Sequence, residues 1–209
     1  MDRRTAIVQR GYDRIAADYA QWRSADGPGV RGAYLERVRS SLTAGAWVLD
    51  LGCGTGANAT AALATSHDVV GVDLSEQSLR LARAALHDVP LVQADIATVA
   101  FAPQSFDAIV AFYSLIHVPR ERHAHVLQGV ATWLRPGSWF VATFGTHGTP
   151  DGAGEFLGVP MYWSSFDEET TLRLVRDAGL DVVSATRETE DEDGRAVEHF
   201  WVVASRPIS

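Results

Sequence analysis

The chain has 209 residues, of which 46% are hydrophobic and 21% are charged, as expected for a single globular domain with an apolar core. Its formal net charge of -8 argues against nucleic acid as a partner, because affinity for a phosphate backbone comes largely from clustered lysine and arginine. We find no secretory leader and no apolar run long enough to span a bilayer, so we expect a cytoplasmic protein with no membrane partner.

The beginning of the chain is predicted to be helical. Apolar residues spaced by four and three positions indicate one face of an amphipathic helix over residues 5–23. The stretch "ADGPG" breaks this helix, and a second helix is expected over residues 30–42. Residues 1–45 therefore form an N-terminal helical cap. The apolar residues of the first helix are Val8, Tyr12, Ile15, Tyr19 and Trp22.

Strands and helices alternate in the next hundred residues, 46–145, which predicts a parallel sheet covered by helices on both faces. This segment is the expected cofactor-binding core. Its predicted elements are strands at 46–51, 68–73, 90–94, 106–112 and 138–144, and helices at 57–65, 75–86 and 119–134.

Residues 146–164, "THGTPDGAGEFLGVPMYWS", form a connection that is too long to be a simple link. Long loops inside compact domains are usually functional or disordered, and large apolar side chains do not favour disorder. We interpret the segment as a lid loop over a pocket; the alternative is an apolar loop that only seals the end of the sheet. Met161, Tyr162 and Trp163 are its predicted substrate contacts, and they suggest an apolar or aromatic acceptor.

The last segment, residues 165–209, is expected to be a helix followed by a β-hairpin. Ser165 and Glu168 have the spacing of a capping box, and Gly179 is placed to stop the helix in the left-handed conformation. Two strands, "LDVVSATRE" and "AVEHFWVVAS", flank the charged turn "TEDEDGR". A hairpin at the edge of the sheet makes one late strand antiparallel to the others.

The stretch "VLDLGCGTG", residues 48–56, runs from a strand into three glycines. Such a turn lets the backbone approach a ligand closely and directs helix N–H groups at it. Gly52, Gly54 and Ala57 satisfy the loose dinucleotide pattern G-x-G-x-x-G/A. Asp50 argues against a dinucleotide, because a carboxylate at the strand end repels pyrophosphate and favours a cation. S-adenosylmethionine is such a ligand, since it carries an ammonium and a sulfonium and no phosphate.

Two more carboxylates follow at successive strand ends. Asp73, in "VVGVDLS", can accept both ribose hydroxyls of a ligand, a feature that NAD would share. Asp95, in "VQADIA", suits an acceptor for the exocyclic amine of adenine, and its alternative role is a helix or turn cap. The three carboxylates together favour S-adenosylmethionine.

The stretches "VLDLGCGTG", "GVDLS", "QADI" and "SFDAIVAFYSLIHVPRE" resemble the ordered motifs of class I S-adenosylmethionine-dependent methyltransferases, over roughly residues 8–205. The resemblance implies a Rossmann-like α/β fold whose seven-stranded, mostly parallel sheet has the order 3-2-1-4-5-7-6, with strand 7 antiparallel. The resemblance also implies which residues contact the cofactor. Gly52, Cys53 and Gly54 would line its methionine part, Asp73 and Leu74 its ribose, and Asp95 and Ile96 its adenine. Phe112, Tyr113 and Ser114 would lie beneath the sulfonium, and Tyr12 and Tyr19 would close over the cofactor.

Among the seven histidines, His117 is the candidate catalytic base. It follows the fourth strand in "YSLIHVP", at the edge where open α/β sheets place their ligands. A neutral imidazole can take a proton from a hydroxyl or an amine. The alternative is that His117 caps the next helix or packs against the cofactor. His147, at the same edge, is a predicted substrate contact, whereas His123 and His199 are expected to be structural.

The sequence therefore predicts one domain, residues 1–209, that transfers a methyl group from S-adenosylmethionine to an oxygen or nitrogen of a small molecule and releases S-adenosylhomocysteine. No metal ligand set is evident. Three alternatives stay open: a protein of this fold that catalyses a non-methyl reaction such as a cyclisation, a non-catalytic cofactor binder, and a nicotinamide-dependent oxidoreductase. The oligomeric state is not predicted.

Overall fold

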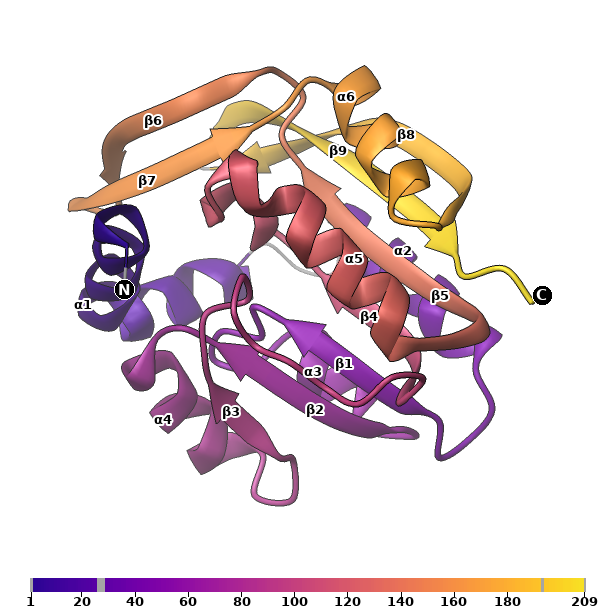
Figure 1. The fold of residues 1–209 in the computed structure, drawn as a ribbon. Helices are drawn as coiled ribbons and strands as arrows, with labels where there is room; N and C mark the ends of the chain where they lie inside the picture. The colour runs from indigo at the N-terminus through magenta and orange to yellow at the C-terminus, as the bar shows by residue number, and fades with distance from the viewer. Residues whose placement is uncertain (1, 26–28, 193, 209) are drawn as a thin grey trace.

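The computed structural model describes residues 2–25, 29–192 and 194–208, and its main feature is a seven-stranded sheet in the order β3-β2-β1-β4-β5-β9-β8 (Figure 1). The strands from β3 to β5 are parallel, and β9 runs antiparallel to both β5 and β8. This confirms the predicted order, since β8 and β9 take the places of the predicted strands 6 and 7. The strands of the sheet are β1 (Trp47–Leu51), β2 (Asp68–Asp73), β3 (Leu91–Gln93), β4 (Phe106–Ala111), β5 (Leu134–Phe144), β8 (Asp181–Glu192) and β9 (Arg195–Ser205).

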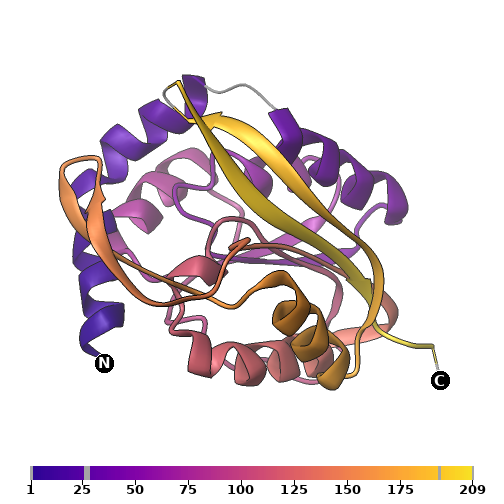
Figure 2. The same ribbon diagram turned by 90° about the horizontal axis from the view of Figure 1, so that it is seen from above.

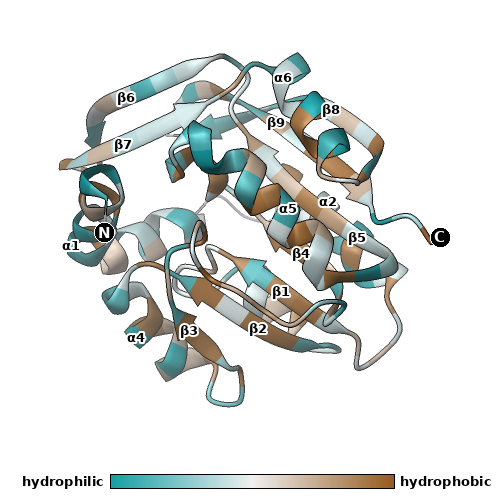
Figure 3. Cartoon of the chain, viewed as in Figure 1, coloured by the Kyte–Doolittle hydropathy of each residue, from teal (hydrophilic) through white to brown (hydrophobic). Residues whose placement is uncertain are grey.

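Helices cover both faces of this sheet. On one face α2 and α3 bury Val38 and Leu63 against the strands, and on the other α5 and α6 bury Leu127 and Val175. The central strands are apolar runs because both of their faces are covered, and Figure 3 shows their hydrophobic colouring. The helices are α1 (Arg3–Ala25), α2 (Gly29–Ser41), α3 (Ala59–Leu63), α4 (Glu76–Ala85), α5 (His123–Trp133) and α6 (Glu168–Asp177), with 3-10 turns η1 (Leu115–His117) and η2 (Arg120–Arg122).

The segment expected to be a lid loop is a β-hairpin. Strands β6 (Thr149–Phe156) and β7 (Val159–Ser165) pair antiparallel around the two-residue turn Leu157–Gly158. Both turn residues have positive φ, +48° and +76°, which is the geometry that matches the twist of a tight hairpin. The glycines and the proline of β6 hide this strand from sequence patterns, because these residues are depleted in strands. The hairpin packs on α1, beside which Figure 2 shows it.

The C-terminal segment also differs from its prediction at two points. The N-cap of α6 is Asp167, whose side chain accepts a hydrogen bond from Thr170 N, whereas Ser165 ends β7 and donates to His147 O. The predicted charged turn is mostly strand, because β8 continues to Glu192. Acidic residues are tolerated there because β8 is the edge strand of the sheet. Gly179 stops α6 with φ +89°, as expected.

Candidate active site

A pocket lies between α1 and the carboxyl ends of β1, β2 and β4, and we name it the strand-end pocket. Its volume is about 710 Å³, counting the space that is open to solvent. Most residues that the resemblance assigns to a cofactor line it, although they come from five separate stretches of sequence. These residues are Tyr12, Tyr19, Gly52, Gly54, Asp73, Leu74, Asp95, Ile96, Phe112, Tyr113 and Ser114.

The glycine turn after β1 forms the floor of this pocket. Gly52 N and Cys53 N donate to Val72 O of β2, at 2.8 and 3.0 Å. Gly52 has φ +86°, and a Cβ there would lie 2.2 Å from Ser114 Cβ, so only glycine fits. Gly52 and Gly54 carry no side chains, so the turn lines the pocket with its backbone.

Asp73, at the end of β2, faces this turn. Its Oδ2 accepts a hydrogen bond from Gly54 N and its Oδ1 from Ser75 N, both at 2.8 Å. Burial raises the pKa of Asp73, and the backbone hydrogen bonds oppose that shift. Each carboxylate oxygen keeps a further lone pair, so Asp73 can also accept hydroxyl groups of a ligand.

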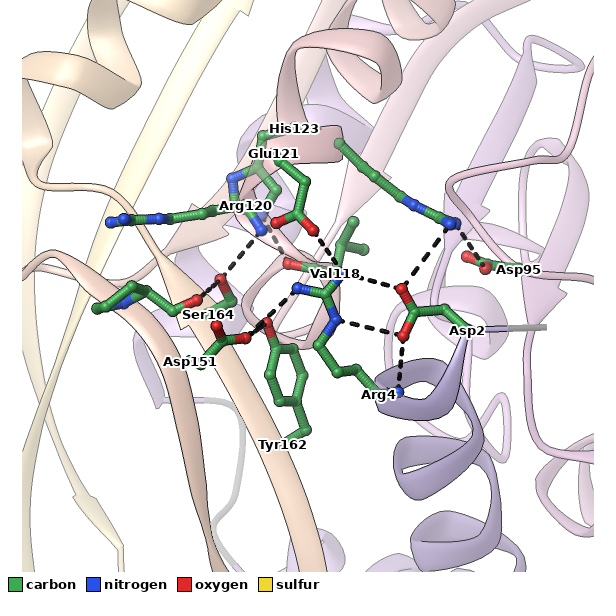
Figure 4. A network of polar contacts seen from close by, with 12 residues as sticks. Asp2, Arg4, Asp95, Val118, Arg120, Glu121, His123, Asp151, Tyr162 and Ser164 are labelled. Carbon is green, nitrogen blue, oxygen red and sulfur yellow. Dashed lines mark hydrogen bonds and ion pairs between the residues drawn. The ribbon is translucent and has the colours of Figure 1, made fainter.

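Asp95 has the alternative role predicted for it, that of a turn cap, and it also lines the strand-end pocket. Its Oδ1 caps the turn by accepting from Ala97 N at 2.9 Å, and its Oδ2 lies 3.6 Å from Arg122 Nη1. Arg122 belongs to the polar network of Figure 4, in which Arg4 at the start of α1 contacts Asp2, Glu121 of η2 and Asp151 of β6. These contacts tie α1 and the β6–β7 hairpin to the rim of the strand-end pocket.

A second pocket adjoins the first, and we name it the hairpin pocket because the β6–β7 hairpin forms one wall. It has a volume of about 950 Å³, counting its open mouth. Tyr12, Tyr19, Tyr113 and His117 line both pockets. These four side chains therefore lie at the boundary between the two pockets.

His117 lies at this junction with both ring nitrogens engaged. Its Nδ1 is 2.7 Å from the carbonyl oxygen of Tyr162, so Nδ1 carries the hydrogen and donates. Its Nε2 is 2.9 Å from the Tyr12 hydroxyl and accepts from it. Burial lowers the pKa of His117 to about 4, which keeps the imidazole neutral at physiological pH. Burial raises the pKa of Tyr12, which stays a neutral phenol.

Comparison with known proteins agrees with this architecture. A family model described as a methyltransferase domain matches residues 48–137. The ubiquinone biosynthesis O-methyltransferase of Thiobacillus denitrificans is 32% identical over 160 residues, which cover 68% of this chain and 68% of that protein. The chain belongs to the class I S-adenosylmethionine-dependent methyltransferases.

Two further comparisons describe the range of this likeness. The O-methyltransferase cnsE of Penicillium expansum is 34% identical to this chain over 164 residues, which cover 71% of this chain and 57% of that protein. The chain thus spans little more than half the length of that relative. A 1,6-didemethyltoxoflavin-N1-methyltransferase of Burkholderia thailandensis, crystallised with 1,6-didemethyltoxoflavin and S-adenosylhomocysteine, has a TM-score of 0.72 at 19% identity, over 97% of this chain and 88% of that one. This last likeness is one of fold.

The strand-end pocket of the methyltransferase has the chemistry that S-adenosylmethionine needs. Asp73 and Asp95 are its acidic side chains, and no lysine or arginine is present among the described residues that line it. An acidic pocket favours a cationic ligand over a pyrophosphate. Gly54, with φ +56°, leaves nothing within 4 Å of where its Cβ would be, so a ligand can lie against its backbone.

Two residues predicted to bind the cofactor do not line this pocket. Asp50 is only 2% exposed and accepts a hydrogen bond from Thr60 Oγ1 at 2.7 Å, because β1 is covered by α3 at this point. Burial raises the pKa of Asp50 to about 7. The Cys53 side chain lies against Gly71 of β2, and Cys53 does not line the pocket. The charge argument made for Asp50 therefore applies to Asp73 and Asp95.

Replacing Asp50 with Asn is expected to stabilise the methyltransferase at neutral pH. An Asp pKa raised from 3.8 to about 7 means that the carboxyl stabilises the fold at low pH, and that this contribution is lost as pH rises from about 4 to about 7. The loss is on the order of 4 kcal/mol in free energy of unfolding at full ionisation. Asn keeps an oxygen for Thr60 and does not ionise. Urea unfolding at pH 4.5, 6 and 8 should show the gap between the two proteins widening with pH.

Asp167→Asn is the control for this measurement. Hydrogen bonds from Thr170 lower the pKa of Asp167, so its substitution should not produce a gap that grows above pH 5. If the free energies of unfolding of Asp50→Asn and the parent instead change with pH in parallel, the ionisation of Asp50 does not destabilise the folded state.

The predicted substrate contacts divide into two groups. Trp163 and His147 line the hairpin pocket. Met161 and Tyr162 do not line either pocket: they are 1% and 3% exposed and pack with Val8 and Ile15 of α1. Met161 and Trp163 lie on the same face of β7, because side chains alternate along a strand, and they differ by their position along it. The prediction for Met161 and Tyr162 as substrate contacts is thus not supported by their placement.

Three residues of the hairpin pocket are not singled out by any sequence motif: Arg23, Glu192 and His199. Arg23 is on the last turn of α1, Glu192 ends β8, and His199 lies on β9. They meet only because β8 and β9 extend as a long hairpin toward α1. His123 is buried between α5 and η1, where its Nε2 lies 3.0 Å from Val118 O and 3.1 Å from Leu115 O, as expected for a structural histidine.

Within the described residues, no three His, Cys, Asp or Glu side chains come close enough together to hold a metal ion. In the same part of the chain, none of the helices has the length and apolar character needed to cross a bilayer.

Proposed function

We propose that this protein transfers a methyl group from S-adenosylmethionine to an oxygen or nitrogen of a small-molecule acceptor that binds in the hairpin pocket. The observation that carries this proposal is the junction of two pockets at Tyr12, Tyr19, Tyr113 and His117. Relatives named as O-methyltransferases favour oxygen as the acceptor atom.

The strand-end pocket would hold the cofactor through groups from three strand ends. Asp73 accepts the ribose hydroxyls, Asp95 and Ile96 hold the adenine, and the Gly52–Gly54 backbone contacts the methionine part. When bound, S-adenosylmethionine supplies a methyl group on a sulfonium, whose sulfur keeps the electron pair as the methyl group passes to the acceptor.

Tyr12 and His117 would remove the proton of the acceptor. The Tyr12 oxygen accepts the hydrogen of the acceptor hydroxyl while Tyr12 passes its own hydrogen to His117 Nε2, along the 2.9 Å hydrogen bond. The Nδ1 hydrogen bond to Tyr162 O orients the ring for this transfer. His117 later returns the proton to water, which its low pKa favours.

The aromatic walls position the acceptor and exclude water. Tyr19, Trp22 and Phe156 form edge-to-face and tilted ring contacts with centroid distances of 5.6 to 6.1 Å, and all three line the hairpin pocket. Fixing two reactants in this way can lower the barrier by roughly 7 to 11 kcal/mol in a well-aligned case.

Calorimetric titration with S-adenosylmethionine, S-adenosylhomocysteine and NAD tests the cofactor. We expect micromolar binding of the first two and none of NAD. Asp73→Asn should weaken binding about 10- to 100-fold, because a hydrogen bond to a charged acceptor is worth about 1.5–3 kcal/mol. Asn is preferred to Ala because its amide oxygen can still accept one of the two backbone hydrogen bonds, from Gly54 N and Ser75 N, that Asp73 accepts. The melting temperature of the variant controls for misfolding.

The outcomes separate the alternatives. Binding of NAD alone would overturn the proposal in favour of an oxidoreductase. Cofactor binding without conversion to S-adenosylhomocysteine across an acceptor screen would favour a non-catalytic binder or a non-methyl reaction.

A small molecule is proposed in place of nucleic acid because the net charge is -8. A cytoplasmic location stays a prediction.

A further inference from the structure

The end of the hairpin pocket formed by Arg23, Glu192 and His199 is not used by the chemistry proposed above. All three side chains line the hairpin pocket, and none lines the strand-end pocket. Figure 2 shows why they meet: the tip of the β8–β9 hairpin lies beside the C-terminal end of α1. This polar end is therefore reached by an acceptor and not by the cofactor.

His199 and Glu192 form a pair in which the carboxylate orients the ring. Nε2 of His199 lies 3.4 Å from Glu192 Oε1. The hydrogen bond from His199, with the charge of Arg23, lowers the pKa of Glu192 and keeps it a carboxylate, which only accepts hydrogen bonds. Nε2 therefore carries the hydrogen, and in the neutral ring Nδ1 has the free lone pair. Tyr113 fixes the ring further through an edge contact at 4.8 Å between centroids.

The charges around this pair are balanced. The positive charge of Arg23 lowers the pKa of Glu192. The other acidic residue that lines the pocket is Glu198, whose Oε2 lies 3.5 Å from Arg187 Nη1. Among the described residues that line the pocket, there is thus no excess of cationic side chains that would select a carboxylate or phosphate. Burying an uncharged polar group beside this pair therefore costs less free energy than burying a charged group.

The rest of the pocket selects a flat apolar body. Trp22, Tyr113, Phe156 and Trp163 line it from α1, the end of β4 and the β6–β7 hairpin. Aromatic side chains prefer offset-stacked or edge contacts with other rings, which adds to simple burial. An aromatic acceptor has the shape that these walls match.

We propose that His199, oriented by Glu192, accepts a hydrogen bond at Nδ1 from a second hydroxyl or N–H group of an uncharged aromatic acceptor. The first such group of the same acceptor lies at Tyr12 and His117. This inference rests on the proposed function and names its substrate class: an aromatic ring that carries two hydrogen-bond donors. His199 is then a specificity-determining residue that binds the acceptor away from the reacting atoms.

The test compares binding of two matched probes, 2-naphthol and 2,7-dihydroxynaphthalene, to the protein saturated with S-adenosylhomocysteine. Calorimetry should show about tenfold tighter binding of the diol, the contribution of one buried hydrogen bond. In His199→Phe the diol should bind no better than 2-naphthol, whose own affinity should be unchanged. His199→Asn should recover part of the difference, because its amide oxygen can take the place of Nδ1. His125→Phe, on the exposed face of α5, is the control and should bind like the parent.

Three results would overturn the inference. Equal affinities of the parent for the two probes would show that no second donor is recognised. An equal loss for both probes in His199→Phe would assign His199 a structural role. Binding of S-adenosylhomocysteine without either probe would reject an aromatic acceptor and leave the cofactor proposal intact. Failure of S-adenosylhomocysteine to bind would instead remove the proposed function itself, and this inference with it.

Discussion

Replacing His117 with Asn should lower kcat by about 100- to 1,000-fold while the affinity for S-adenosylhomocysteine changes less than about threefold. General base catalysis contributes on this scale, and the substitution removes the group that receives the proton. Asn can still donate to Tyr162 O from the position of Nδ1, so the contact that anchors the β6–β7 hairpin is kept. Steady-state kinetics with an acceptor found by screening, together with calorimetry for the cofactor product, measures both quantities.

Tyr12→Phe gives the matched test, because Tyr12 donates to Nε2 of the same ring. If the two residues act in one proton path, the double variant should be no slower than the slower single variant. If the fold-losses in kcat of the two single variants multiply in the double variant, Tyr12 and His117 act independently. A kcat that stays within threefold of the parent in His117→Asn would rule out the base.

The pH profile adds an independent check on His117. Its pKa is lowered to about 4 by burial, and the neutral form is the one that accepts a proton, so kcat/KM should stay level from pH 8 to 6 and fall only as pH approaches 4. Tyr12 does not ionise in this range because burial raises its pKa. A decline centred near pH 6.5, the ordinary value for histidine, would contradict the environment described for the ring.

Gly52→Ala should destabilise the fold by about 2–5 kcal/mol and abolish cofactor binding. The left-handed conformation costs an alanine about 1–2 kcal/mol, and forcing a methyl group into a filled space costs about 1–3 kcal/mol more. The added Cβ would lie 2.2 Å from Ser114 Cβ. Urea unfolding measures the free energy of unfolding, and titration with S-adenosylhomocysteine measures binding.

Gly179→Ala separates the conformational cost of the left-handed backbone from the steric cost of the clash with Ser114. Its φ of +89° is close to the +86° of Gly52, but nothing lies within 4 Å of the added Cβ, so only the conformational cost of about 1–2 kcal/mol should appear. The double variant Gly52→Ala/Ser114→Gly should regain the part due to the clash, when compared with Ser114→Gly alone. Equal losses at Gly52 and Gly179 would show that the loop moves away from Ser114 without cost.

Local sequence was sufficient for the sheet and for most of the lining of the strand-end pocket. The strands β1 and β4 are followed directly by Gly52 and Phe112, β2 ends at Asp73, and parallel strands bring their carboxyl ends to one edge. Ligand groups that follow strand ends are therefore predictable once the strands are. The antiparallel edge hairpin follows in the same way from two late strands and a turn.

The direction in which single side chains point needed the tertiary structure. Asp50 belongs to the glycine motif, yet β1 turns its carboxylate under α3, away from the pocket. Met161 and Trp163 are two residues apart on the same face of β7 and belong to the same apolar cluster, yet only Trp163 also lines the hairpin pocket, because the two residues lie at different points along the strand.

The hairpin pocket, the proposed acceptor site, is formed by long-range packing alone. Tyr12 and His117 are 105 residues apart in the chain and meet only where α1 crosses the strand ends, and Glu192 reaches Arg23 only because β8 continues through a charged stretch that composition assigns to a turn. Sequence periodicity reports which residues are buried within one element, since burial repeats along it. It does not report which elements face each other across a pocket, since that depends on how helices and hairpins pack on the finished sheet.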